Sequence, residues 1–158
     1  MTAFQCIPIP TDTARRFRRT GLDDNGNTVR RVVSESGESP CRHCLRFGAA
    51  GEAMLLGSYN LPRPCGIYWT PSPIFVHAED CVQFASPNTI APIIAEGALV
   101  SVRAYDAADQ CLYELGQVCT GTEVKAPLAR ALGDARTAFV NVHTARPGCL
   151  LARVERIA

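Results

Sequence analysis

The sequence lacks a marked excess of charge of either sign. Its 158 residues include 16 lysines and arginines and 15 aspartates and glutamates, which gives a formal net charge of +1. Binding to nucleic acid or to an anionic membrane relies on a strongly basic surface. The four arginines within residues 15–19 are interpreted as the solvated face of a helix. We therefore expect neither nucleic acid nor a membrane among the partners of this protein.

Long apolar runs are also missing. The longest, residues 90–95, is far shorter than the roughly 20 residues that cross a bilayer, and it contains Pro92. Residues 1–8 carry neither the basic segment nor the apolar core of a signal peptide. These absences predict a cytoplasmic protein, in which the eight cysteines are expected to stay mostly reduced rather than form disulfides.

Several enzyme signatures are absent from the chain. It has no glycine-rich phosphate loop, no HExxH metalloprotease helix, no nucleophile elbow and no dinucleotide-binding fingerprint. Their absence excludes the enzyme classes that depend on these motifs and leaves other enzymes possible.

Length and pattern predict one domain, residues 1–158, of the α+β class. The expected architecture is a strand-rich mixed or antiparallel sheet with a few short helices. We expect residues 45–47 and 53–59 to form a hairpin, and the proline-rich segment 61–73 to be a surface loop. The last four predicted strands, 98–105, 111–119, 137–143 and 149–156, are expected to share one sheet.

Alternation along the late strands predicts a polar sheet face. Successive strand residues point to opposite sides, so the valines at positions 100, 102, 140 and 142 are expected in the core. The opposite face then carries arginine, tyrosine and histidine, which suit an oxyanion. Our leading hypothesis is that this face binds an anionic small molecule or peptide. The residues proposed to bind it are Arg42, Arg103, Tyr105, His143 and Arg146. The structural alternative is an ordinary solvated face.

Two close pairs of soft ligands suggest a zinc site. They are Cys41-x-x-Cys44 and His77-x-x-x-Cys81, three thiolates and one imidazole. The sequence has Leu45 where a zinc knuckle usually has glycine. In an extended chain His77 and Cys81 would lie about 13 Å apart, so residues 78–80 must turn. Unpaired thiols and a Cys41–Cys44 redox pair remain the alternatives.

A catalytic thiol is a further possibility. His143 precedes Cys149 across the predicted turn 145–148, and Cys41 is a second candidate nucleophile. Two alternatives thus stand beside the leading hypothesis. One is an enzyme that uses a Cys/His or metal centre, and the other is a zinc-stabilised interaction module.

Several short motifs together resemble a bacterial family of unknown function, family 1203. They are Pro40–Leu45 (PCRHCL), Gly51–Glu52, Pro73–Ala78 (PIFVHA) with Cys81, Arg103–Asp106 (RAYD) and Val142–Cys149 (VHTARPGC). The resemblance covers nearly the whole chain and implies a small stand-alone bacterial protein. It brings no established activity, cofactor or substrate, and it marks these residues as the candidate site.

Overall fold

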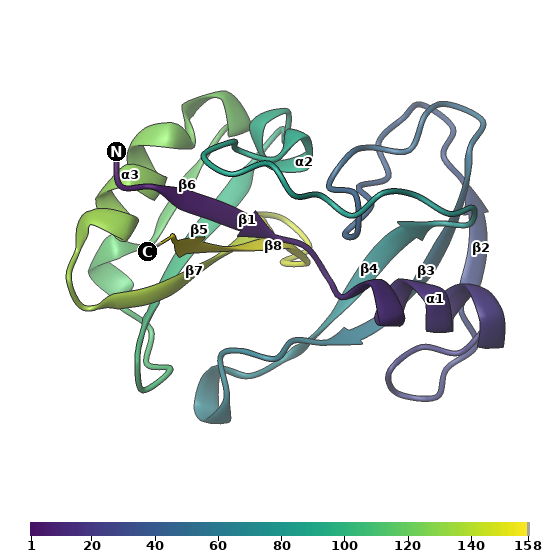
Figure 1. The fold of residues 1–158 in the computed structure, drawn as a ribbon, viewed down its shortest axis with the longest axis horizontal. Coiled ribbons are helices and arrows are strands. Elements are labelled where there is room, and N and C mark those ends of the chain that lie inside the picture. The colour runs from purple at the N-terminus through teal and green to yellow at the C-terminus, as the bar shows by residue number, and fades with distance from the viewer. Residues whose placement is uncertain (158) are drawn as a thin grey trace.

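The computed structural model describes residues 1–157, which contain two antiparallel sheets lying side by side (Figure 1). One sheet has five strands in the order β1-β8-β7-β5-β6, and the other has three in the order β2-β3-β4. The strands are β1 (Phe4–Ile7), β2 (Arg30–Val33), β3 (Ala53–Asn60), β4 (Pro71–His77), β5 (Val100–Asp106), β6 (Gln117–Cys119), β7 (Thr137–Thr144) and β8 (Leu150–Arg156). The predicted strand-rich α+β class is confirmed.

Three short α-helices cover the sheets. Helix α1 (Thr11–Thr20) lies against the three-stranded sheet, while α2 (Pro92–Ala95) and α3 (Lys125–Gly133) pack on the five-stranded one (Figure 1). Single 3₁₀ turns occur at η1 (Gly66–Tyr68), η2 (Tyr113–Leu115) and η3 (Gly121–Glu123). Within residues 1–157 no helix has both the length and the apolarity needed to cross a membrane.

The valine face of the five-stranded sheet forms the first of two core clusters. Val102 of β5 lies opposite Val142 of β7, and Ala104 lies opposite Val140. The valines at positions 100, 102, 140 and 142 are completely buried, as predicted. Apolar side chains of α2 and α3, including Ile93 and Leu128, pack on them.

The second core cluster belongs to the three-stranded sheet. Phe17 of α1 packs there with Met54 of β3 and with Ile74 and Val76 of β4. The loop that begins near residue 38 lies between the clusters, since Cys41 and Cys44 belong to the second cluster whereas Leu45 belongs to the first. This loop is where the candidate site is built.

The four late segments share the five-stranded sheet, as predicted, but segment 111–119 is not one strand. Cys111 makes a single bridge to Tyr105, η2 follows, and only β6 pairs regularly with β5. The 3₁₀ turn brings Leu115 into the core, where its burial compensates for the interrupted ladder.

The predicted hairpin of residues 45–47 with 53–59 is wrong. Strand β3 pairs with β2 and β4, while Phe47 makes only an isolated bridge to Pro40. The loop predicted for 61–73 also ends early, because Pro71 and Pro73 lie in β4. Strand β4 is an edge strand, where a proline without an N–H group breaks no ladder.

Candidate metal centre

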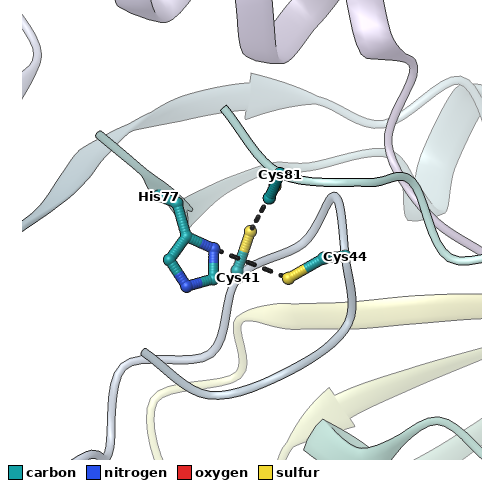
Figure 2. Close-up of side chains that lie close together, drawn as sticks. All are labelled: Cys41, Cys44, His77 and Cys81. Atoms are coloured by element: carbon teal, nitrogen blue, oxygen red, sulfur yellow. Dashed lines mark hydrogen bonds between the residues drawn. The ribbon is translucent and has the colours of Figure 1, made fainter. Parts of the chain in front are cut away.

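Cys41, Cys44, His77 and Cys81 converge at the loop between the two cores (Figure 2). One ligand atom from each, three Sγ atoms and a ring nitrogen, lie within 4.8 Å of one another. Cys41, Cys44 and His77 are buried, and Cys81 is half-buried. The residues of the predicted zinc site are therefore close together and can bind a metal ion.

The spacing of these atoms is close to that around a tetrahedral zinc ion. A Zn–S bond of about 2.3 Å and a Zn–N bond of about 2.0 Å place two sulfur ligands roughly 3.8 Å apart and a sulfur and a nitrogen roughly 3.5 Å apart. Cys41 Sγ lies 3.9 Å from Cys81 Sγ, and Cys44 Sγ lies 3.5 Å from His77 Nδ1 (Figure 2). Two edges of the tetrahedron are thus already set by the fold.

A tight turn positions Cys41 and Cys44. Cys41 is bridged to Phe75 of β4, and the Leu45 N–H donates to the Cys41 carbonyl at 3.0 Å, which closes the turn. Leu45 has a φ of 55°, in the left-handed region that glycine usually occupies. The position expected to be glycine thus keeps the glycine conformation, and its leucine side chain is buried in the first core.

A bend after β4 positions the other two ligands. His77 is the last residue of β4, and the chain bends at residues 78–79 before Cys81 returns to Cys41. Arg18 of α1 holds this end of the strand, with Nε donating to the His77 carbonyl at 3.0 Å. The turn that the sequence required between His77 and Cys81 is present.

Glu52 orients the histidine ligand. Its Oε2 lies 3.3 Å from His77 Nε2, on the side of the ring away from Cys44. Histidines that bind metals through one ring nitrogen commonly donate the other N–H to a carboxylate. When His77 is neutral, as a metal ligand must be, Glu52 therefore favours the tautomer in which Nδ1 carries no proton.

Cationic and polar groups surround Cys81. Arg18 Nη2 lies 3.5 Å from Cys81 Sγ, and His43 Nδ1 lies 3.1 Å from the same sulfur. Thr11 in turn contacts His43 Nε2 at 3.0 Å. Three thiolates with a divalent zinc ion would sum to a net charge of −1, and the Arg18 guanidinium, which also pairs with Asp80 at 3.3 Å, would lie beside that charge.

Sequence reasoning assigned no role to these surrounding residues. Glu52 and His43 occur in the motifs that resemble the family, which was the one available signal. Arg18 comes from a helix far away in the chain and had been interpreted as part of a solvated face. No local pattern connects it to Cys81.

Close contacts within the site shift the pKa values of Cys41, Cys44 and His77. Hydrogen bonds with Cys44 and Cys81 lower the pKa of the Cys41 thiol, and the Cys41 partner raises the pKa of Cys44. Hydrogen bonds with Cys41 and then Cys81 raise the pKa of His77 to about 10. The thiolate form of Cys41 is thus favoured although Cys41 is buried. A bound metal ion would stabilise that thiolate further.

The predicted polar face exists but is covered. Arg103, Tyr105 and His143 share one side of the five-stranded sheet, opposite the valines. The segment after β3 lies over this side: the Arg63 guanidinium sits 4.2 Å from the centre of the Phe139 ring, and Tyr68 packs edge-on against Tyr105. Tyr105 and His143 are consequently buried.

The residues proposed for thiol catalysis do not form a linked set. The His143 ring makes one hydrogen bond, from Nδ1 to the Gly148 carbonyl at 2.9 Å, and within residues 1–157 its buried Nε2 has no partner. Burial, together with the nearby Arg103, lowers the pKa of His143 to about 4. Cys41 belongs to the candidate metal site, which we call the metal cluster (Cys41, Cys44, His77 and Cys81), and Cys149 instead lines a pocket.

That pocket, of about 660 Å³, contains two of the five residues proposed to bind a ligand. Arg42 and Arg146 line it, whereas Arg103, Tyr105 and His143 do not. Arg42 is the residue that follows the candidate metal ligand Cys41, so the pocket and the candidate metal site share one loop.

The fold and the cluster define a small α+β domain with a largely buried three-cysteine, one-histidine site. The chain belongs to the family described as "Protein of unknown function (DUF1203)", whose model matches residues 38–156. The matched region includes all four candidate metal ligands and Glu52, while Arg18 precedes it. No curated protein and no solved structure matches the chain.

Proposed function

We propose that this protein is a zinc-stabilised binding domain, in which one zinc ion ties the loop between the two cores to the end of β4. The ligands of that ion would be Cys41, Cys44, His77 and Cys81. The observation that carries the proposal is the convergence of four ligand atoms within 4.8 Å of one another, with one sulfur pair 3.9 Å apart and one sulfur–nitrogen pair 3.5 Å apart, as tetrahedral zinc requires.

The donor set favours zinc in a structural role. Three thiolates and an imidazole suit zinc and disfavour magnesium or calcium, which take oxygen ligands. Four protein ligands complete a tetrahedron and leave no open position for a substrate, unlike a catalytic zinc site. A Cys41–Cys44 redox pair would need neither His77 nor the Glu52 carboxylate beside it.

Metal content tests the proposal directly. Protein purified without chelator is expected to carry about one zinc ion per chain by elemental mass spectrometry. Cys44→Ser is expected to lower that content, because it removes one of the thiolates. Cys65→Ser is the matched control, since Cys65 is exposed and lies outside the cluster.

Stability supplies the second readout. Chelation at neutral pH is expected to lower the melting temperature, because the binding free energy of a structural zinc site is also folding free energy. Metal-free protein whose melting temperature is unchanged by added zinc would reject the zinc site. If such protein also oxidises rapidly and reversibly between Cys41 and Cys44, the redox hypothesis replaces it.

A further inference from the structure

The pocket beside the metal cluster has walls from three parts of the chain. They are the loop at residues 37–47, the connection from α2 into β5 at residues 96–100, and the β7–β8 turn with its flanks at residues 144–151, and Phe75 of β4 and Ile93 of α2 complete the wall. Much of the wall is apolar, with Phe47, Phe75 and Leu99 among its side chains. A volume of about 660 Å³ is within the range of small-molecule sites, roughly 300–1,000 Å³.

Arg42 lines this pocket, and its buried guanidinium has N–H groups without a hydrogen-bond partner among the described residues. Its side chain is held by two backbone carbonyls, with Nε 2.6 Å from the Leu150 oxygen and Nη1 2.6 Å from the Pro40 oxygen. Within residues 1–157 Nη2 has no hydrogen-bond partner, and no carboxylate forms an ion pair with Arg42. Only 2% of Arg42 is exposed, and buried charges are normally paired.

The charges around the pocket restrict the kind of anion. Arg146 is exposed and lines the pocket, and so do Glu38 and Glu96. The Glu38 carboxylate already accepts hydrogen bonds from the backbone and hydroxyl of Ser36. Two cations and two carboxylates leave no surplus positive charge, so a ligand with one negative charge fits better than a dianion such as a phosphate monoester.

We infer that this pocket binds an organic monocarboxylate. Its carboxylate would accept hydrogen bonds from Nη2 and the second Nη1 hydrogen of Arg42, and its apolar part would lie against Phe47, Phe75 and Leu99. Guanidinium and carboxylate match as planar, two-pronged partners. The inference does not depend on zinc, although Arg42 is adjacent in sequence to a proposed zinc ligand.

A competing explanation is that Arg42 acts only as a counterion of the metal cluster. Burial lowers the pKa of Arg42 to about 10, and attraction by Cys149 and Cys41 opposes that effect. In that case the pocket would have no preference for an acid over a neutral molecule of the same shape. The two explanations are distinguished by comparing the binding affinities of an acid and of an uncharged molecule of the same shape.

The experiment uses the whole chain as purified, with decanoate and its uncharged analogue decanamide as probes in isothermal titration calorimetry. Decanoate is expected to bind with an affinity roughly tenfold or more above that of decanamide, because the hydrogen bonds to Arg42 are charge-assisted. Decyl phosphate is expected to bind more weakly than decanoate because of Glu38 and Glu96.

Leu99→Glu tests the location without touching Arg42, whose bonds also hold the loop. The new carboxylate is expected to weaken decanoate binding by roughly tenfold or more, since it places a like charge and a polar group in the wall. Leu22→Glu is the matched control, because Leu22 has a similar exposure and lies outside the pocket. Arg146→Ala is expected to weaken binding less.

Three results would overturn the inference: no binding of decanoate, equal binding of decanoate and decanamide, or binding unaffected by Leu99→Glu. Zinc content is measured on the same samples, so the two proposals fail separately. Protein without zinc that still prefers decanoate refutes the zinc site alone. Zinc-loaded protein without that preference refutes the carboxylate pocket alone.

Discussion

At the scale of single residues, Leu45 occupies a position with two conflicting requirements. The turn that places Cys41 and Cys44 needs a left-handed backbone, which costs a residue with a Cβ about 1–2 kcal/mol. Burying a leucine contributes about 1.5–3 kcal/mol, and its side chain has no exposed surface. Burial is therefore large enough to offset the strain, and leucine is compatible with the turn.

This balance predicts an unusual order of stability. Leu45→Ala loses the burial and keeps the strain, so it is expected to cost about 2–5 kcal/mol of unfolding free energy. Leu45→Gly also loses the burial but relieves the strain, and is expected to be more stable than Leu45→Ala by about 1 kcal/mol. Urea unfolding at a fixed zinc concentration measures both. An alanine variant at least as stable as the glycine variant would contradict the strained turn.

Glu52 is a second single residue on which the metal site depends. It would affect zinc affinity through its contact with His77 and not by binding the metal. Glu52→Gln is expected to lower zinc affinity by roughly 10–100-fold, because the carboxylate that orients His77 is lost. Competition with a chromogenic chelator measures the affinity. Glu35→Gln, an exposed position in the preceding loop, removes the same charge and is expected to leave the affinity unchanged. Equal effects of the two substitutions would assign the loss to net charge alone.

At the scale of elements, the β5–β7 pair determines what each side of the five-stranded sheet can do. One side packs under α2 and α3, and the other is covered by the segment after β3. On this second side Tyr105 and His143 are buried, whereas Arg103 is half-buried. The pocket that we propose as a carboxylate site lies at the end of the sheet, beside the β7–β8 turn.

The valine side of this pair is expected to be sensitive to truncation. Val102→Ala removes two methyl groups from a position with no exposed surface, and is expected to cost about 1–3 kcal/mol in urea unfolding. Val118→Ala on β6 is the control, because Val118 is 56% exposed and its change should stay within about 0.5 kcal/mol. Similar costs at both positions would contradict this assignment of the core.

At the scale of the whole molecule, the two cores are expected to respond differently to metal removal. The ligand loop is bonded to β4 through the Arg42 N–H and the Phe75 carbonyl, whereas β5 and β7 pair without help from the cluster. Chelation is expected to speed amide hydrogen exchange in residues 38–47 and β4 much more than in β5 and β7. Mass spectrometry of peptide fragments resolves these regions. A uniform change across both sheets would show that the molecule unfolds as one unit.

Much of the fold was predictable because local patterns determine it. Alternation along residues 100–105 and 137–143 identified the buried valines, since a strand has a fixed period of two. The hairpin proposed for residues 45–47 was wrong because a short apolar run does not reveal a left-handed residue. The loop predicted for residues 61–73 included the start of β4, because proline excludes a central strand and the sequence did not show that β4 is an edge.

The sequence alone determined the donor types of the metal cluster and their pairing, because Cys41-x-x-Cys44 and His77-x-x-x-Cys81 are local patterns. Only the tertiary structure decided that the two pairs meet and that Arg18 and Glu52 contact them. It also decided that Arg42 lines a pocket, whereas Tyr105 and His143 are covered. These outcomes depend on contacts between segments distant in the chain. Such contacts follow from how the two sheets pack, and the spacing of residues along the chain carries little information about that packing.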